Sequence, residues 1–315
     1  MTAPVPGSAA LAFVKAHGTG NDFVLLPDPQ GELALTAALT RALCDRHLGL
    51  GGDGAIRLAP GEESPGDPSA DVFMDYRNAD GSVAEMCGNG VRCVAKYVVD
   101  RAPGLDRVRV GSRAGTKEVA VVSRHPDGRV DRLRVDMGAP EVLADDHPLT
   151  VGGTRFSAVT VSMGNPHAVL VVEDVDIVPL ARLGPAIETH TDFGQGTNVE
   201  VIAPLGGGRI AGRIWERGVG ETLASGTGAS AMAVAAHQRG LVGREVTVTL
   251  PGGTLDVRLD DPTLWVTGPA VEVASGQLDP AWWGQARAGE AESTGDPAPS
   301  GDAPPTDEPT TTGVM

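Results

Sequence analysis

The chain has 315 residues, 41% of them hydrophobic, with 41 acidic against 25 basic residues and a formal net charge of −16. This length and composition allow two domains, each with a core of its own. An acidic surface gains no counterion release from a nucleic acid or an anionic membrane, so the charge argues against both as partners.

The first residues, 1–7, lack the basic region and the apolar run of a secretory signal. No segment reaches the roughly 20 apolar residues that a membrane span requires. We therefore expect a soluble, cytoplasmic protein.

The cysteines and lysines indicate chemistry without a bound group. The three cysteines, Cys44, Cys87 and Cys93, are an odd number without the spacing of a zinc site, so we expect reduced thiols and no metal. No lysine lies in a phosphate-cradling loop, and no Walker or Rossmann fingerprint occurs, so we expect no organic cofactor. Cys44 and Cys93 are interpreted as buried core residues.

Short Val-rich segments with alternating polarity predict strands along most of the chain. Pro126–Gly128 and Pro251–Gly253 predict turns between neighbouring strands, and the polar segment 60–68 predicts an exposed loop. The composition changes after Trp283, and residues 286–315 predict a disordered acidic tail rich in Pro, Gly and Thr. The predicted strand segments are 119–122, 133–135, 156–161, 169–172, 246–250 and 254–259.

Two segments have the apolar spacing of a helix instead, and they lie 138 residues apart. The first contains Val91, Val94, Ala95 and Val98, and the second contains Ala229, Met232, Ala233 and Ala236. The same offset aligns the residues before them, which are Cys87-Gly88-Asn89-Gly90 with Ser225-Gly226-Thr227-Gly228, and Tyr76-Arg77-Asn78 with Ile214-Trp215-Glu216.

An earlier pair of turns also matches if a small length change is allowed. Gly20-Asn21-Asp22 in the first half corresponds to Gly164-Asn165-Pro166 in the second. Three matching elements in the same order predict a duplicated chain.

The start of each predicted helix suits the binding of an anion. The first N–H groups of a helix have no partner inside it and carry partial positive charge, and glycines leave that end uncovered. The same field favours a thiolate, so we expect the pKa of Cys87 to lie below that of a free cysteine.

Two such helix starts, facing one site from opposite sides, suit the inversion of a carbon centre. One side chain removes the α-proton of an amino acid while the other returns a proton to the opposite face. The helix N–H groups would stabilise the charge that develops on the carboxylate. His167 and Glu216 are candidates for setting the protonation states of this pair. Candidates for hydrogen bonds to a polar substrate are Asn21, Asn78, Asn89, Asn165, Asn198 and Arg217.

These motifs resemble diaminopimelate epimerases of the actinobacterial type, from Phe13-Val14-Lys15-Ala16-His17-Gly18-Thr19-Gly20-Asn21-Asp22-Phe23 to about Trp283. The most specific stretches are Asn78–Ser82, Met86–Arg92, Ser162–His167 and Glu216–Thr222. The resemblance implies an α+β fold of two similar domains related by a pseudo-twofold axis. Each domain would be a mainly antiparallel, barrel-like sheet around a central helix. We expect an N-terminal lobe at 1–140 and a C-terminal lobe at 141–285.

The resemblance also implies a reaction, namely the interconversion of LL- and meso-diaminopimelate in lysine and peptidoglycan precursor biosynthesis, without cofactor or metal. It implies a homodimer that takes a small amino-acid substrate. By motif, Cys87 would be one catalytic acid/base group, with His167 and Glu216 modulating the pair, and Ser225 would take the position of the second catalytic group. The implied substrate contacts are Asn21, Asn78, Gly88, Asn89, Asn165, Asn198, Glu216, Arg217, Gly226 and Thr227.

Two positions depart from the family pattern. The family has Phe-Asp-Gln where this chain has Gly52-Asp53-Gly54, so a glutamine that contacts substrate is missing. The family also has cysteine where this chain has Ser225, and a hydroxyl is a far weaker acid than a thiol near neutral pH.

Three interpretations of Ser225 remain open at this point: an introduced change in an ordinary epimerase, a natural variant with slow or one-directional activity, or a fold adapted to one-base chemistry such as an amino-acid dehydratase or racemase. A catalytically silent amino-acid-binding homologue is the alternative from a different functional class.

Overall fold

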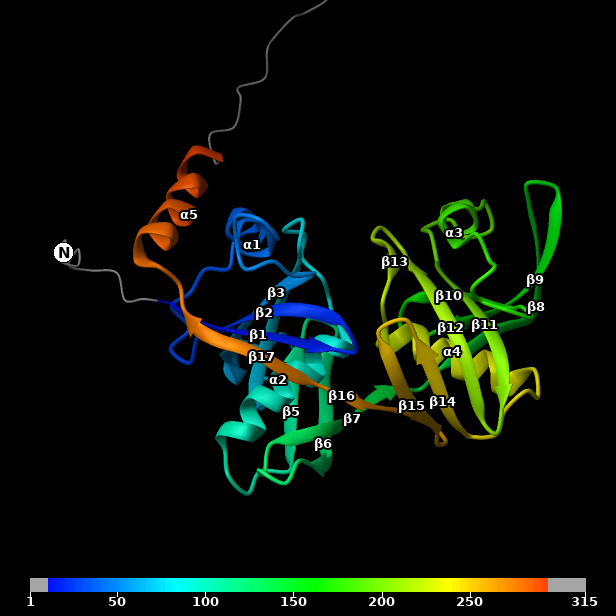
Figure 1. The fold of residues 1–315 in the computed structure, drawn as a ribbon, viewed down its shortest axis with the longest axis horizontal. Helices are drawn as coiled ribbons and strands as arrows, with labels where there is room; N and C mark the ends of the chain where they lie inside the picture. The colour runs from blue at the N-terminus through cyan, green and yellow to red at the C-terminus, as the bar shows by residue number, and fades with distance from the viewer. Residues whose placement is uncertain (1–10, 294–315) are drawn as a thin grey trace, which may run out of the picture.

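Two lobes of similar build lie side by side in the computed structural model, which describes residues 11–293 (Figure 1). The first lobe contains β1 (Ala12–Gly18), β2 (Asn21–Pro27), α1 (Ala37–Cys44), β3 (Gly54–Pro60), a 3-10 turn η1 (Gly61–Glu63), β4 (Val72–Asn78), α2 (Gly88–Arg101), β5 (Arg107–Ser112), β6 (Gly115–Arg124) and β7 (Val130–Gly138).

The second lobe follows with β8 (Glu141–Val151), β9 (Thr154–Ser162), β10 (Pro166–Val171), α3 (Leu180–Glu188), β11 (Asn198–Gly206), β12 (Arg209–Glu216), β13 (Gly220–Thr222), α4 (Gly226–Gln238), β14 (Glu245–Leu250), β15 (Gly253–Leu259) and β16 (Leu264–Pro269). The chain ends in β17 (Val271–Gln277) and α5 (Pro280–Ser293). The six predicted strand segments lie in β6, β7, β9, β10, β14 and β15, except that the one at 169–172 extends one residue beyond β10. Both predicted turns connect neighbouring strands, and Gly253 of the second turn is the first residue of β15.

The order of strands confirms the predicted duplication. Neighbours in the first lobe run β17-β1-β2-β3-β4-β5-β6-β7, and in the second β8-β9-β10-β11-β12-β14-β15-β16. The parallel pairs also correspond, because β2–β3 matches β10–β11 and β4–β5 matches β12–β14. The remaining pairs in these two series are antiparallel, so the fold is α+β with mainly antiparallel sheets.

Each sheet wraps around one helix. Helix α2 contacts β1, β2, β5, β6, β7 and β17, and helix α4 contacts all eight strands of its own series. Surrounded in this way, α4 is buried on every face from Ala229 to Ala236, which explains its run of small residues. Helices α1 and α3 lie instead on the outside of their lobes, each with a separate apolar cluster.

The lobes are joined by two features. Strands β7 and β16 pair with each other, which connects the two sheets into one. Strand β17 then crosses back to pair with β1, and α5 packs against α1 (Figure 1). The last part of the segment 141–285 therefore lies against the first lobe, although the sequence places it in the second.

Two further segments differ from the sequence-based expectation. Helix α5 continues to Ser293, inside the segment predicted to be a disordered tail, while residues 294–315 of that tail lie outside the described residues. The predicted loop at 60–68 contains the turn η1, and its Gly61 and Ser64 are buried rather than exposed.

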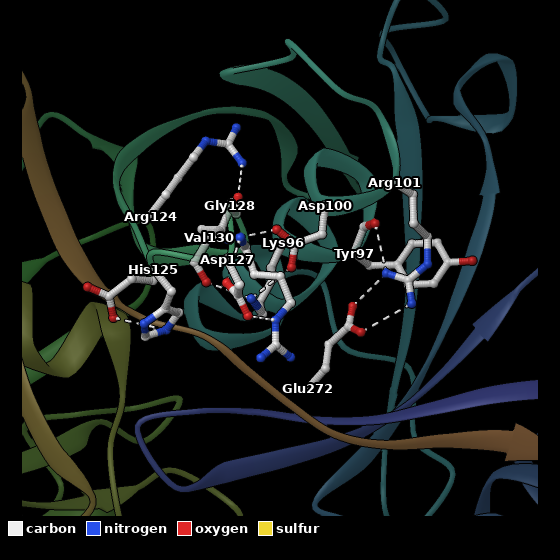
Figure 2. Close-up of polar contacts among 12 residues, drawn as sticks. Lys96, Tyr97, Asp100, Arg101, Arg124, His125, Asp127, Gly128, Val130 and Glu272 are labelled. Carbon is white, nitrogen blue, oxygen red and sulfur yellow. Dashed lines mark hydrogen bonds and ion pairs between the residues drawn. The ribbon is translucent and has the colours of Figure 1, made fainter.

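The C-terminal end of α2 is tied to its surroundings by polar contacts (Figure 2). Lys96 donates to Asp100 at 2.8 Å and to the carbonyl of Val130 at 2.6 Å. Arg101 donates to both carboxylate oxygens of Glu272 in β17, at 2.7 and 3.1 Å. The returning strand and the far end of α2 thus hold each other in place, and the opposite end of the helix faces the second lobe.

Candidate active site

Both inner helices begin at the residues that the sequence singled out. Cys87 is the N-cap of α2 with an extended backbone, φ −141° and ψ 116°, and Ser225 is the N-cap of α4 with φ −134° and ψ 134°. The Ser225 hydroxyl accepts a hydrogen bond from the N–H of Gly228 at 3.2 Å. The Cys87 thiol makes no such cap bond. The two positions correspond in backbone geometry and differ in what the side chain does.

The two helix starts meet at the junction of the lobes. A β-carbon built on Gly88 would lie 3.4 Å from the Cα of Gly226, and Met137 packs beside both glycines. The side-chain amide of Asn89 donates to the carbonyl of Ala224 at 3.0 Å, across the junction. A β-carbon on Gly226 would lie 3.3 Å from the Cα of Gly88, so glycine after the N-cap allows the closest approach.

On the first-lobe side, Asn21 contacts the thiol. Its Oδ1 is 3.6 Å from Cys87 Sγ and accepts from Asn89 Nδ2 at 3.2 Å. Its Nδ2 donates to Asp53 at 2.7 Å, and Asp53 is held in turn by Arg46 at 2.8 Å. The orientation of the Asn21 amide is therefore fixed at both ends, with its oxygen toward Cys87.

The missing glutamine at position 54 has a steric explanation. A β-carbon on Gly54 would lie 2.5 Å from the ring of Tyr76 and 2.6 Å from the carbonyl oxygen of Arg77. The Tyr76 hydroxyl occupies this region and donates to Asn78 Oδ1 at 2.9 Å. Tyr76 therefore holds Asn78, and glycine is the residue that leaves room for it.

On the second-lobe side, His167 forms a buried pair with Glu200. Both side chains are fully buried, and His167 Nδ1 lies 2.6 Å from Glu200 Oε1. The other ring nitrogen, Nε2, lies 3.0 Å from Asn165 Oδ1. Sequence reasoning missed Glu200, although an acidic residue inside the apolar stretch Asn198–Ala203 was a signal of a buried charge.

Glu216 lies beside Ser225. Its carboxylate accepts from Thr222 Oγ1 at 2.6 Å. Burial raises the pKa of Glu216, and the hydroxyls of Thr222 and Ser225 act in the opposite direction. The charge of Glu216 in turn raises the pKa of Cys87, so the two groups lie within electrostatic reach across the junction.

The other predicted contacts hold loops near the site. Asn198 is buried, donating to the carbonyl of Pro166 at 2.9 Å and accepting from the N–H of Arg217 at 2.9 Å. The guanidinium of Arg217 is exposed and donates to the carbonyl of Gln195 at 3.1 Å. Asn198 thus ties the segment before His167 to the segment after Glu216. Thr227 Oγ1 lies 3.4 Å from Ser225 Oγ.

The expected lowering of the pKa of Cys87 is wrong for this structure. Burial raises the pKa of Cys87 to about 11, and the helix N–H groups of Gly90 and Asn89 offset that rise only in part. Cys44 and Cys93 are buried, as predicted, with exposed fractions of 5% and 1%. Cys87 is the partly exposed thiol of the three.

Metal-binding groups and surface depressions indicate no other site in the described residues. Among residues 11–293, no three His, Cys, Asp or Glu side chains are grouped in a way that could hold a metal ion. Two shallow depressions, one lined by Arg244 and Arg258 and one by Arg155 and Arg239, contain none of the predicted site residues.

Solved structures share the fold at low sequence identity. A hydroxyproline epimerase from Agrobacterium vitis aligns with a TM-score of 0.65 and 17% identity, over 85% of this chain and 90% of its own. A probable proline racemase from Agrobacterium radiobacter aligns with a TM-score of 0.66 and 17% identity, over 85% and 93%. These likenesses establish the two-lobe architecture.

Sequence comparison identifies the family. The diaminopimelate epimerase model matches residues 13–143 and 159–277. A diaminopimelate epimerase from Synechocystis is 43% identical over 288 residues, covering 86% of this chain and 99% of its own. One from Mycobacterium leprae is 43% identical over 293 residues, covering 87% and 98%. The chain belongs to the diaminopimelate epimerase family.

Proposed function

We propose that this enzyme converts LL-diaminopimelate to meso-diaminopimelate by proton transfer at the α-carbon, with Cys87 on one face and Ser225 on the other. The observation that carries the proposal is the approach of Gly88 to Gly226, which brings two N-capped helix starts together. Family membership supplies the substrate class. The proposed reaction belongs to lysine and peptidoglycan precursor biosynthesis and uses no cofactor or metal.

In this proposal the free N–H groups at the two helix starts bind the α-carboxylate. The Cys87 thiolate removes the α-proton, the electron pair spreads onto the carboxylate, and the hydroxyl of Ser225 gives a proton to the opposite face. Removing the α-proton leaves a carbanion whose charge the helix ends stabilise. The reaction removes one proton from the α-carbon and returns one proton to it, so no oxidant or reductant is needed.

His167 and Glu216 are proposed to modulate this pair, since both lie in the second lobe near Ser225. The proposed substrate contacts are the groups around the junction: Asn21, Asn78, Gly88, Asn89, Asn165, Asn198, Glu216, Arg217, Gly226 and Thr227. The Asn89 side chain is already fully hydrogen-bonded inside the protein. Its proposed contribution to substrate is therefore its backbone N–H.

Ser225 makes the second proton transfer slow, because a hydroxyl is a weak acid and this one also caps α4. Exchange on the Cys87 face needs only the thiol. We therefore propose a natural epimerase with slow inversion, in preference to a silent binding homologue, because Cys87, His167 and Glu216 are all present.

The test incubates the enzyme with LL-diaminopimelate in D2O and follows both stereoisomer composition and α-deuterium. We expect meso-diaminopimelate to form and α-deuterium to appear, with both lost in Cys87→Ala. Binding with no deuterium at high enzyme concentration would instead favour the silent homologue. An unsaturated or keto product would favour the dehydratase.

We further propose a cytoplasmic homodimer with a lobe boundary near residue 140 and a second boundary near residue 270. Strand β17 pairs with first-lobe strand β1, which supports the second boundary. The helices among residues 11–293 lack the length and hydropathy of a transmembrane helix. Sedimentation at several protein concentrations tests the dimer, and a monomer throughout would contradict it.

A further inference from the structure

A single arginine lies buried behind the two helix starts. Arg92, in the first turns of α2, has an exposed fraction of 0%. Its guanidinium fills space that two glycines leave free: a β-carbon on Gly18 would lie 3.1 Å from Nη2, and one on Gly268 would lie 3.2 Å from Nε. Gly268 belongs to β16 of the second lobe, so the guanidinium is enclosed by both lobes.

The charge of Arg92 has no anionic partner within the described residues. Its hydrogen bonds go to neutral oxygens, from Nη2 to Thr19 Oγ1 at 3.0 Å and Asn89 Oδ1 at 2.7 Å, and from Nε to the carbonyl of Pro269 at 3.2 Å. Nη1 is buried without a partner. A buried cation without an anion is costly, so its presence calls for a compensating function.

Arg92 fixes the amide that connects the two lobes. Because Asn89 Oδ1 accepts from Arg92, Asn89 Nδ2 points the other way, to the oxygen of Asn21 and to the carbonyl of Ala224. Asn21 faces the Cys87 thiol, and Ala224 immediately precedes Ser225. One chain of hydrogen bonds therefore leads from the guanidinium to both helix starts.

Thr19, the other partner of Arg92 Nη2, has an unusual backbone. It is the non-glycine residue with a positive φ, 57°, among the described residues, and it is 2% exposed. A β-branched residue in this conformation is strained and is retained where the surroundings hold it. Its hydroxyl is held by Arg92, so the turn between β1 and β2, which leads into Asn21, depends on the same guanidinium.

The second lobe has no equivalent cation. The offset of 138 residues places Ser230 of α4 where Arg92 lies in α2, and the Ser230 hydroxyl bonds back to the carbonyl of Gly226 at 2.8 Å. Of these two matching positions, only the one in the first lobe carries a positive charge.

We propose that Arg92 is a positioning residue that orients Asn89 between the two helix starts, and that its buried positive charge behind the carboxylate site favours the anionic forms of both the substrate and Cys87. The assignment of the carboxylate site rests on the proposed function. The effect on Cys87 does not, since the thiol can be studied without substrate.

The test measures the rate of Cys87 alkylation by iodoacetamide as a function of pH, for the wild type, Arg92→Gln and Arg92→Lys. Modification of Cys87 is read by peptide mass, which separates it from the buried Cys44 and Cys93. We expect Arg92→Gln to react at least about threefold more slowly at a fixed pH near 9, because removing a nearby positive charge disfavours the thiolate. Arg92→Lys keeps the charge and should restore most of the rate.

The matched control is Lys96→Met, which removes a different buried cation from the same helix, one that pairs with Asp100 away from Asn89. It should leave the alkylation profile unchanged. Turnover is a second readout, with KM for LL-diaminopimelate expected to rise and kcat to fall in Arg92→Gln.

A folded Arg92→Gln with the wild-type alkylation profile and an unchanged KM would overturn the proposal. If Arg92→Gln does not fold, the variant Asn89→Ala is tested in its place. Asn89→Ala breaks the chain of hydrogen bonds and keeps the positive charge of Arg92. A fall of at least about tenfold in kcat is then expected, and wild-type turnover would overturn the proposal. Because alkylation needs no turnover, an inactive wild type would refute the proposed function and leave the effect of Arg92 on Cys87 testable.

Discussion

Gly88 and Gly226 are each other's nearest neighbour across the lobe junction: a β-carbon on Gly226 would lie 3.3 Å from the Cα of Gly88. Each glycine follows the N-cap residue of its helix, so the contact joins the two residues proposed to act on the α-carbon. A β-carbon at this distance would be closer than an ordinary van der Waals contact. The backbone would have to move to make room, because the neighbouring atom belongs to a glycine and not to a flexible side chain.

The first prediction concerns this approach. Gly226→Ala should push the two helix starts apart by a few tenths of an ångström and lower kcat by at least about tenfold, because misplaced groups transfer protons poorly. Stability should change little. The control is Gly243→Ala, where a β-carbon would meet nothing within 4 Å. Wild-type turnover in Gly226→Ala would show that the junction tolerates separation.

The second prediction concerns the buried pair of the second lobe and its apolar counterpart in the first. An offset of 144 residues aligns His167 with Phe23 and Glu200 with Ile56, in the same strand register. All four side chains are buried. The second lobe therefore has a histidine and a carboxyl group at two positions where the first lobe has buried apolar side chains.

Glu200→Gln should lower the free energy of unfolding by about 1–3 kcal/mol, because the buried hydrogen bond between His167 Nδ1 and the Glu200 carboxyl group is weakened or lost. The double variant His167→Phe/Glu200→Ile has the two apolar residues found at the matching positions of the first lobe. Its free energy of unfolding should lie within about 1 kcal/mol of the wild-type value, since apolar replacement of a buried pair is often neutral. Its epimerisation rate should nevertheless fall by at least about tenfold. Denaturant unfolding and turnover measure the two effects, and full activity in the double variant would contradict a role for the pair.

The third prediction concerns pH. Burial raises the pKa of Asp22, but hydrogen bonds and charge from Arg46 and Lys15 outweigh burial and hold it well below its ordinary value of 3.8. A carboxyl group with a depressed pKa contributes stability above the unfolded pKa, and this contribution is lost as the pH falls through the folded pKa. The stability that Asp22 contributes is therefore lost as the pH falls below about 4.

Arg46→Met should accordingly move the midpoint of acid unfolding to higher pH, as followed by circular dichroism. Arg244→Met is the control, because Arg244 pairs with Asp261 at an exposed position. Equal midpoints for Arg46→Met and the wild type would contradict the assigned stabilisation of Asp22.

The sequence predicted the parts of the site that the duplication repeats. The matching stretches at Cys87 and Ser225 gave both helix starts, because their glycines and apolar spacing occur twice with one offset. The repeated apolar spacing also predicted helices α2 and α4. His167 and Glu216 were candidates from their spacing to Asn165 and Ser225, and the family pattern supported both.

Features that depend on distant partners were missed. Glu200 lies in an apolar strand, and nothing local shows that its partner is His167, 33 residues earlier. The return of β17 to the first lobe was also missed, because a strand pattern gives no information on which strand it pairs with. The raised pKa of Cys87 follows from burial and, to a smaller extent, from the charge of Glu216, and the helix start alone reveals neither.

The most direct test of the central claim, that Cys87 and Ser225 serve opposite faces of one α-carbon, compares the wild type with Ser225→Cys in the epimerisation of LL-diaminopimelate. We predict a gain of at least about 100-fold, the contribution of one well-placed acid/base group, despite about 1 kcal/mol lost with the serine cap. Ser225→Ala loses the same cap and should show no gain. An unchanged rate in Ser225→Cys would contradict the account, because position 225 would then not face the substrate.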